Sequence, residues 1–459
     1  MIEKRVLEEM LGIAVSTGAD FAEVYSEITR NNNINFLDGR VEEIGDNTVS
    51  GVGIRIFLGT RTVYASTTDL SYNGLLNCAR SVAAALCDTK KIENICLTER
   101  IFPNIHPVKT VPTSAEMKIK TDLLREGCVA AKEYDERIVQ VNGVLVSVDH
   151  TIQIANTEGL LTSDRHIRTR MAITAAASDG KEMQSGFDGP GGGVGLEFFE
   201  TVKPKDIGIE AAKQAITNLS AGYCPAGKMT VAIENGFGGV IFHEACGHSL
   251  EATSVGTGTS QMCGKLGQKI ANEKVTAIDD GTIPGAWGSV NIDDEGHPTQ
   301  RNVLIENGIL KSYMVDRLGS RRMGMPMTGN SRRQNYTFEP TSRMTNTFID
   351  NGPDKNEDII SSIEYGLYAK KMGGGSVNPL TGAFNFAVSE GYMVRNGKIC
   401  EPVRGASLIG TGAEILMNID MVGQNLARGQ GMCGSASGSV PTDVGQPLIR
   451  VSEITVGGK

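Results

Sequence analysis

The stretch IFHEACGHSLE, at residues 241–251, places two of the chain's six histidines five positions apart, with a glutamate directly after the first. Two imidazoles and a neighbouring carboxylate are the groups that a metal-dependent hydrolase needs: ligands for a Lewis-acidic ion, and a base for the water that the ion polarises. We therefore take His243 and His248 as candidate metal ligands and Glu244 as a candidate general base. The alternative is a pair of unrelated histidines on a core helix.

The separation of the two histidines predicts a distorted helix. In the familiar zinc-protease helix the histidines stand at i and i+4, about 40° apart around the axis. His243 and His248 stand at i and i+5, which is about 140° on a regular helix and too wide for one shared ion. Either a π-type bulge or a bend where Gly247 weakens the helix would bring the two rings together.

Apolar residues at helical spacing lead into this motif. We expect Asn235 to cap the helix and the apolar residues among 237–245 to face the interior. Glu244 and His248 continue that stripe, and a buried carboxylate is costly unless it is paired or lies beside a cation. This favours a polar site set into the core over a helix with Glu244 at its rim. Glu251 follows on the same side and would either orient the imidazole of His248 or be an ordinary solvated acid.

A catalytic zinc site usually takes three protein ligands and keeps a fourth position for water, so a distant residue must complete the set. The chain has nine cysteines and no CxxC pair among them. Cys246 lies inside the motif, and Cys433 lies in the glycine-rich segment QGMCGSASGSVP. Composition and spacing leave both cysteines open as the third ligand.

Longer blocks of sequence carry a resemblance to a known family. HEACGHSLE is followed in order by DDEG (293–296), GNSRRQNY (329–336), GGGSVNPLTGAFNF (373–386) and GMCGSASGSVPTDVGQP (431–447). From about residue 223 to the C-terminus the chain resembles the TldD/PmbA metallopeptidases, with a weaker match in the N-terminal third. That family pairs a metal-bearing TldD subunit with a PmbA (TldE) subunit that lacks the metal motif. Because this chain keeps the motif, it resembles the TldD type.

The resemblance implies a role for each motif residue. His243 and His248 match the two histidine ligands, Glu244 matches the catalytic glutamate, and Cys433 matches the distal thiolate ligand. Cys246 falls where the family carries small or apolar residues, so we expect it to pack in the core. The predicted ion is Zn²⁺, although two imidazoles and a thiolate would also accept iron or cobalt. Zinc would activate a water and polarise the scissile carbonyl, while Glu244 would pass the proton to the leaving amine.

Two further segments are candidate contacts for the substrate. Asn330, Arg332 and Arg333 place an amide and two guanidinium groups in one short loop, which suits a peptide carboxylate or carbonyl. In the second segment, glycines around Gly374 would let a peptide backbone add to a strand edge, and Asn378 follows within reach. The alternatives are surface salt bridges for the arginines and a plain turn for the glycines.

Composition limits the class of protein. A chain of 459 residues, 40% hydrophobic and 21% charged, is typical of a globular protein with more than one domain. The net charge of −9 argues against a nucleic-acid partner. We find no apolar stretch long enough to span a bilayer, and the opening MIEKRVLEEM is unlike a secretory signal. Unpatterned cysteines without an export signal predict a reducing, cytoplasmic location.

Read for organisation, the chain predicts an α+β fold in three parts. Residues 1–110 and 111–222 each read as helix, strands, helix, joined by the proline-rich linker FPNIHPVKTVP. In the second unit Thr113 and Glu116 suggest a capping box. Residues 223–459 read as a β-rich metallopeptidase domain with short strands, dense glycine and a mixed or barrel-like sheet. The expected helices lie at 2–17, at 69–86, from the capping box to about 133, at 204–219 and near 356–371. The expected strands lie at 20–28, 33–38, 49–57, 61–66, 137–147, 151–156, 160–165, 167–176 and 229–234.

These observations predict a cytoplasmic zinc peptidase that acts on small or unfolded peptides. The resemblance implies a dimer, with a PmbA/TldE-type subunit or with itself, that encloses the site; we expect no nucleic-acid or membrane partner. The alternative is a non-catalytic regulator of the gyrase-modulator type with a structural metal. The two differ over Glu244, because a structural site has no need of a free carboxylate beside its ligands.

Overall fold

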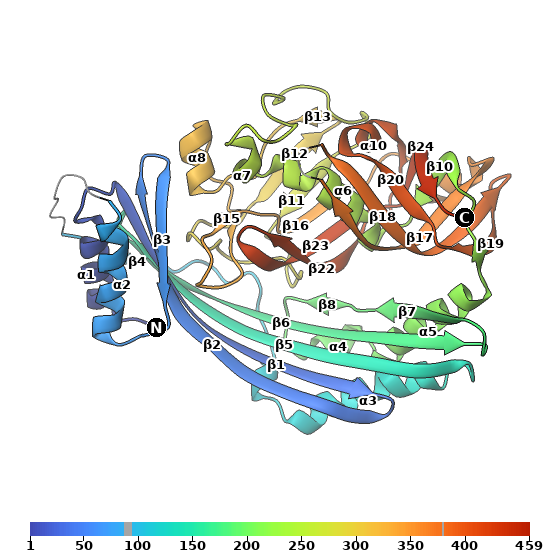
Figure 1. The fold of residues 1–459 in the computed structure, drawn as a ribbon, viewed down its shortest axis with the longest axis horizontal. Coiled ribbons are helices and arrows are strands. Elements are labelled where there is room, and N and C mark those ends of the chain that lie inside the picture. Colours follow the sequence, from blue (N-terminus) through green and yellow to red (C-terminus); the bar gives the residue numbers. More distant parts are fainter. Residues whose placement is uncertain (87–93, 379–380) are drawn as a thin grey trace.

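The structure is a computed structural model that describes residues 1–86, 94–378 and 381–459. Helices and strands are mixed throughout, and the C-terminal half is rich in short strands, so the predicted α+β class is confirmed. A long, curved sheet from the first half of the chain forms one layer, and the C-terminal half sits on its concave side (Figure 1). Among the described residues, no helix combines the length and apolar character that crossing a membrane requires.

One eight-stranded sheet carries most of the chain's first half. Its long strands run in the order β3, β2, β1, β5, β6, each antiparallel to its neighbours, and β4, β7 and β8 pair with β6. The strands are β1 (Phe21–Leu37), β2 (Arg40–Leu58), β3 (Arg61–Thr67), β4 (Thr98–Glu99), β5 (Ile138–Asn156), β6 (Leu160–Ser178), β7 (Met183–Asp188) and β8 (Gly191–Gly192). The sequence pattern placed β1 in the unit 1–110 and β5 in the unit 111–222. Because these two strands are hydrogen-bonded neighbours, the strands of both units belong to one sheet.

Helices cover the outer side of this sheet at its two ends (Figure 1). At one end α1 (Lys4–Val15) packs against α2 (Tyr72–Ala84), and at the other α3 (Met117–Lys132) packs against α5 (Pro204–Ser220). Each pair closes a hydrophobic core of its own. The short helix α4 (Phe198–Thr201) and a 3-10 turn, η1 (Pro112–Ser114), complete the layer.

The strands of this sheet are longer than the sequence pattern predicted. The segments expected at 20–28 and 33–38 are one strand, β1, because its polar middle is paired: the Asn32 side chain donates to the Gly45 carbonyl at 3.1 Å. The expected breaks inside β5 and β6 are likewise wrong. The capping box is also wrong, since α3 begins at Met117 and the Glu116 side chain makes no capping hydrogen bond.

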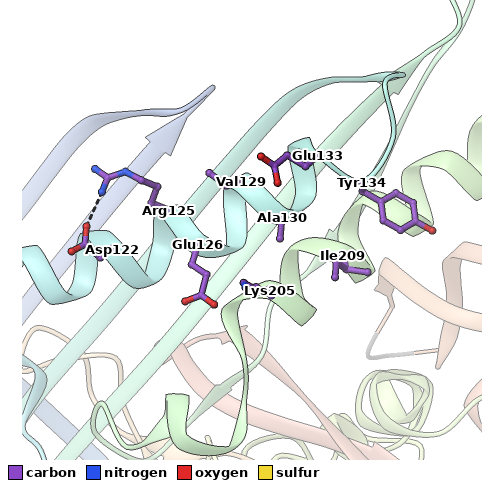
Figure 2. A pocket seen from close by; sticks show the side chains of 9 residues that line it. All are labelled: Asp122, Arg125, Glu126, Val129, Ala130, Glu133, Tyr134, Lys205 and Ile209. Atoms are coloured by element: carbon purple, nitrogen blue, oxygen red, sulfur yellow. Dashed lines mark hydrogen bonds and ion pairs between the residues drawn. The ribbon is translucent and has the colours of Figure 1, made fainter.

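The outer side of α3 and α5 is hollowed into a cavity of about 630 Å³ (Figure 2). Its lining carries both charges, and Asp122 pairs with Arg125 at 2.7 Å. None of the predicted site residues lines this hollow. This hollow is therefore not the predicted site, whereas a cavity of about 670 Å³ elsewhere is lined by Gly374, one of the predicted residues.

The C-terminal half contains two larger sheets and one small one. The first has the order β17, β10, β24, β20, β18, β19, β9, and β17 also pairs with β18, so this sheet closes on itself as a barrel-like arrangement. The second has the order β13, β12, β11, β16, β23, β22, and β14 pairs with β15. The strands are β9 (Gly222–Tyr223), β10 (Gly227–Ile233), β11 (Ala277–Asp280), β12 (Arg301–Glu306), β13 (Ile309–Leu310), β14 (Ser331–Arg332), β15 (Thr341–Ser342), β16 (Asn346–Ile349), β17 (Tyr365–Val377), β18 (Ala383–Arg395), β19 (Lys398–Arg404), β20 (Ser407–Thr411), β21 (Ile419–Val422), β22 (Ala427–Ser435), β23 (Gly438–Gln446) and β24 (Ile449–Gly457).

Short helices fill the space around these sheets. The motif helix α6 (Val240–Ala245) contacts β16 and β23 of one sheet and β17 and β18 of the other, so it lies between them. The helix expected near 356–371 is shorter, because α9 (Asn356–Ser361) gives way to β17 at Tyr365. The remaining helices are α7 (Ala252–Val255), α8 (Arg317–Met323) and α10 (Gly412–Asn418).

A buried cluster of charges joins the long sheet to the C-terminal half. Arg55 of β2 is fully buried and forms ion pairs with Glu23 at 2.8 Å and with Glu295. Arg333, from the C-terminal half, lies over the ring of Tyr25 at 4.1 Å and approaches Glu23 at 3.4 Å. These contacts require a defined placement of the two parts, because an unpaired buried charge is strongly destabilising.

Candidate metal centre

The motif forms two short helical pieces rather than one regular helix. A 3-10 turn, η2 (Gly236–Gly239), leads into α6, which ends at Ala245, and a second 3-10 turn, η3 (Gly247–Leu250), follows. Between them Cys246 has φ −129° and ψ −44°, well away from helical values. The predicted distortion is confirmed, and it is a break at Cys246, not a π-type bulge.

Two contacts hold the segments on either side of this break. A Cβ at Gly247 would lie 2.3 Å from Sδ of Met344, so only glycine lets the second turn pack here without displacing that side chain. The Asn235 side chain does not cap the helix as predicted; its amide donates to the Asn425 carbonyl at 2.7 Å. The start of the motif is thus held by a tertiary contact instead of a local cap.

The break brings both imidazoles to one sulfur. Nε2 of His243 lies 3.2 Å from Sγ of Cys433, and Nε2 of His248 lies 3.3 Å from the same atom. The two rings stand edge to face, with centroids 5.1 Å apart. Cys433 comes from β22, the edge strand of its sheet, where it pairs with Val440 of β23. Within the described residues these three side chains form the cluster that could hold a metal ion.

The spacing of these donor atoms fits zinc. For tetrahedral zinc with bonds of about 2.3 Å to sulfur and about 2.05 Å to nitrogen, the nitrogen and sulfur atoms lie about 3.5 Å apart. The observed separations of 3.2 and 3.3 Å are close to that value. Cys246 is excluded from the cluster, because its Sγ faces the Gly412 carbonyl at 3.5 Å. It packs in the core, as the resemblance implied.

The electrostatics of the cluster favour a thiolate. Burial raises the pKa of the Cys433 thiol, but the charges and hydrogen bonds of His243 and His248 outweigh burial and lower this pKa to about 3. Burial lowers the pKa of His248, and Glu251 and Cys433 outweigh burial and raise it well above its ordinary value. Cys433 is therefore a thiolate, and a bound metal cation would neutralise its negative charge.

Two glutamates flank the cluster in different ways. Glu251 is buried, with an oxygen 3.1 Å from Nδ1 of His248, so it forms an ion pair behind the ring and is not a solvated acid. Glu244 is partly open to solvent, with an oxygen 3.8 Å from Nε2 of His248. It lines a cavity of about 180 Å³ together with His243, Cys433 and Gly374. The Glu244 carboxylate thus faces a space beside two of the three donor residues.

The structure buries the three residues predicted to bind substrate from one loop. The Asn330 amide donates to Asp279 at 2.7 Å and to the Arg343 carbonyl at 3.0 Å. Arg332 donates to the Met344 carbonyl at 2.7 Å, and Arg333 to the Asp294 carbonyl at 3.0 Å. The surface salt-bridge alternative is therefore wrong. Contact of these residues with a substrate stays a prediction.

The glycine segment lies closer to the cluster. Gly374 is exposed on β17 and lines the cavity that contains His243 and Glu244. Asn378 lies just beyond β17, where its backbone N–H donates to the Ala383 carbonyl at 2.8 Å. Their roles with a substrate stay predictions.

Sequence reasoning missed one residue that holds the cluster together. Arg343 is fully buried; it donates to the Cys433 carbonyl, to the Ser437 hydroxyl at 2.9 Å and to the Gly438 carbonyl at 2.8 Å. It therefore fixes the hairpin that carries the thiol. In the sequence, Arg343 is only one arginine in the segment SRMTNTFI, and the sequence does not show which groups its side chain would contact.

Comparison with known proteins places the chain in a family. Family models of the PmbA/TldA metallopeptidases match residues 22–86 (domain 1), 111–219 (central domain) and 226–458 (C-terminal domain). A protein of Haemophilus influenzae named metalloprotease TldD homolog is 36% identical, over 100% of this chain and 97% of its own. A zinc metalloprotease TldD homolog of Saccharolobus solfataricus is 32% identical over 57% of this chain and 58% of its own.

Solved structures share the fold. A candidate modulator of a DNA gyrase from Thermotoga maritima superposes with a TM-score of 0.80 at 22% identity, over 99% of this chain and 100% of that one. TldE from Thermococcus kodakarensis superposes with a TM-score of 0.77 at 19% identity, over 99% of this chain and 100% of that one. At these identities the likeness concerns the fold, while the full-length relative and the three family models decide membership. The chain belongs to the TldD/PmbA metallopeptidase family, described in those models as PmbA/TldA, as a member of the TldD type.

Proposed function

We propose that this protein is a zinc-dependent peptidase of the HExxxH type that hydrolyses small or unfolded peptides. One observation carries the proposal: the donor atoms of His243, His248 and Cys433 lie within 4.8 Å of one another, and the Glu244 carboxylate lines a cavity together with His243 and Cys433. The names of the relatives, metalloprotease and in one case zinc metalloprotease, support the same activity.

Each side chain has a part in this proposal. His243, His248 and Cys433 would hold the ion. When bound, zinc would supply Lewis acidity at the scissile carbonyl and a lower pKa for the attacking water. Glu244 takes the proton of that water and passes it to the leaving amine, for which its position in the cavity is suitable. Glu251 keeps the proton of His248 on Nδ1, so that Nε2 has a free lone pair.

A peptide would lie along β17. This strand pairs with β10 only as far as Ala369, and beyond it with β18 alone among the described strands, so residues 370–377 present a free edge. A Cβ at Gly374 would meet nothing within 4 Å, which leaves room for a second backbone. Asn330, Arg332, Arg333 and Asn378 complete the proposed substrate contacts.

The proposal extends to organisation. We infer a dimer with a PmbA/TldE-type subunit or with a second copy, a cytoplasmic location, and a division at 1–110, 111–222 and 223–459. The fold shared with a TldE protein supports such a pairing. A non-catalytic regulator with a structural metal is the competing function, and one variant separates the two.

That variant is Glu244→Gln, measured with zinc-loaded protein and unstructured peptides. We expect unchanged zinc content and loss of cleavage, because the amide cannot take up a proton. Glu414→Gln, an acid of α10 outside the cavity, serves as the control and should cleave normally. Normal cleavage by Glu244→Gln would remove the mechanism. Full biological activity of a metal-free preparation would favour the regulator.

A further inference from the structure

A second cavity, of about 270 Å³, lies between the long sheet and the strand that carries Cys433. Its floor is the inner face of the long sheet, where cross-strand pairing aligns two rows of side chains. The first row is Asn31, Val148 and Arg168; the second is Thr29, His150 and His166. Three strands thus present one polar surface toward the C-terminal half.

The roof of this cavity comes from the C-terminal half. Arg332 and Arg333 enter from one side, and Met432 and Pro441 from the β22–β23 hairpin. Asp294 also lines the cavity, and its carboxylate accepts the Arg333 backbone N–H at 2.7 Å. Among the residues that line the cavity, three guanidinium groups thus face one carboxylate, while Asp164, Asp443 and Asp279 act on the arginines from outside the lining.

Two of these guanidinium groups, those of Arg168 and Arg332, have no carboxylate within ion-pair distance among the described residues. Arg168 is 5% exposed, and its Nε donates to the Trp287 carbonyl at 3.0 Å. Arg332 is 4% exposed, and one Nη donates to the Met344 carbonyl at 2.7 Å. Within the described part of the chain neither forms an ion pair, and both Nη atoms of Arg168 have no hydrogen-bond acceptor. Arg333 differs, because Glu23 lies 3.4 Å away.

A buried guanidinium without a counterion is costly, so such a pair calls for an explanation. Burial and the repulsion of Arg332, only partly offset by Asp294, Asp164 and Asp443, lower the pKa of Arg168 to about 9. Burial and the repulsion of Arg343 outweigh the attraction of Asp294, Asp279 and Cys433 and lower the pKa of Arg332 to about 10. Both groups are cations at neutral pH, and an anion between them would relieve the repulsion. A planar carboxylate matches the N–H geometry of guanidinium groups.

The position of the cavity connects it to the metal centre. Met432 lines this cavity and also the one that contains His243 and Glu244. It precedes Cys433 on the edge strand β22, where alternate side chains face opposite sides. A peptide held at the metal would therefore need only a few further residues to pass this edge and reach Arg168.

We propose that Arg168 and Arg332 form a carboxylate-binding subsite for the substrate, which receives an acidic side chain or the C-terminal carboxylate a few positions from the scissile bond. This inference rests on the proposed peptidase function and adds a specificity to it. It assigns the arginines a direct contact with the substrate, while the reaction itself stays with Glu244 and the metal.

The first test needs no variant. Zinc-loaded wild-type protein would be given two series of peptides. In the first, one residue is either glutamate or glutamine, and its position varies along the peptide. In the second, the C-terminus is either a free acid or an amide. In one register we expect KM to rise about tenfold or more when the carboxylate is neutralised, the size of a charge-assisted hydrogen bond. Dependence on glutamate identifies the side chain as the source, and dependence on the free acid identifies the terminus. Equal KM values for all pairs would overturn the subsite.

The second test uses Arg168→Gln and Arg332→Gln. We expect each to abolish the difference in KM between the acidic peptide and its neutral partner. Arg165→Gln is the matched control, because Arg165 lies on the same strand but pairs with Asp149 at 2.8 Å on the other face. Preference for the acidic peptide that survives both substitutions would also overturn the subsite.

Failure of the proposed function has a separate signature. If zinc-loaded wild type cleaves none of the peptides, the peptidase proposal fails. Binding of the same pairs to Glu244→Gln, followed by calorimetry, then tests the subsite alone. Tighter binding of the acidic member that is lost in Glu244→Gln/Arg168→Gln supports the subsite, and equal binding of both members overturns it.

Discussion

Glu251 places a carboxylate oxygen 3.1 Å from Nδ1 of His248, while Nε2 of the same ring faces Cys433 at 3.3 Å. A carboxylate at one ring nitrogen holds the proton there and leaves the other nitrogen free to bind an ion. The same carboxylate lies 3.9 Å from Nε of Arg343, which also binds the Cys433 backbone. One buried group thus links a histidine and the thiol-bearing hairpin.

This relationship predicts the effect of Glu251→Gln. The amide oxygen can still accept from Nδ1, but the negative charge that strengthens the ring as a ligand is gone. We expect zinc affinity to fall about 10- to 100-fold, measured by competition with a chromogenic chelator. Glu453→Gln, an exposed acid paired with Lys228, should leave the affinity unchanged. Unaltered affinity in Glu251→Gln would contradict the orienting role.

The two motif cysteines give opposite predictions. Cys433→Ser removes the thiolate between the two imidazoles, so we expect purified protein to lose most of its zinc. Cys246→Ala removes a buried sulfur that only packs, so we expect full zinc content and a loss of stability of about 1 kcal/mol. Metal analysis of both variants, with urea unfolding, checks the pair. Zinc loss in Cys246→Ala with zinc retained in Cys433→Ser would reverse the assignment.

Much of this site was predictable from sequence, for a physical reason. His243, Glu244 and His248 lie within six residues, and their angular mismatch on a regular helix already required the break that the structure has at Cys246. The choice of Cys433 over Cys246 needed the family blocks. Spacing alone cannot connect residues 190 positions apart in the chain.

Other features depended on tertiary partners that a sequence does not display. The sequence suggested substrate contacts for Arg332 and Arg333, with surface salt bridges as the alternative, but it did not show that both side chains are buried and that Arg333 lies over Tyr25 of the long sheet. Strand β1 continues through Asn31 and Asn32 because neighbouring strands supply hydrogen-bond partners for their polar side chains. Local propensity favours a turn at such residues, and sheet pairing overrides that preference.

The buried charge cluster makes Arg55 a stability determinant. Arg55→Met removes the cation from between Glu23 and Glu295, both 2% exposed, and leaves two buried carboxylates without their main partner. We expect the free energy of unfolding to fall by about 3–5 kcal/mol, measured by urea denaturation of the metal-loaded protein. Arg137→Met, which breaks an exposed pair with Asp135, should cost less than about 1 kcal/mol. Similar losses in the two variants would contradict a special role for burial.

Asp443 predicts a pH dependence of stability. It is 1% exposed, and burial, only partly offset by Arg428 and by hydrogen bonds from Trp287 and Gln430, raises its pKa from 3.8 to about 6. Because the folded protein holds this proton more tightly than the unfolded chain, the stability present below pH 4 is lost as pH rises through about 6.

Asp443→Asn removes this titration. Relative to wild type, its free energy of unfolding should therefore increase by about 1 kcal/mol between pH 5 and pH 8, which means that the variant becomes relatively more stable. The loss of contacts with Arg428 changes the difference in free energy of unfolding between the two proteins by a nearly constant amount. The change of this difference with pH therefore reports on the carboxyl group alone. Urea denaturation of both proteins at intervals across this range measures the difference. A difference that stays constant, or narrows as pH rises, would show that Asp443 ionises in the folded protein without penalty.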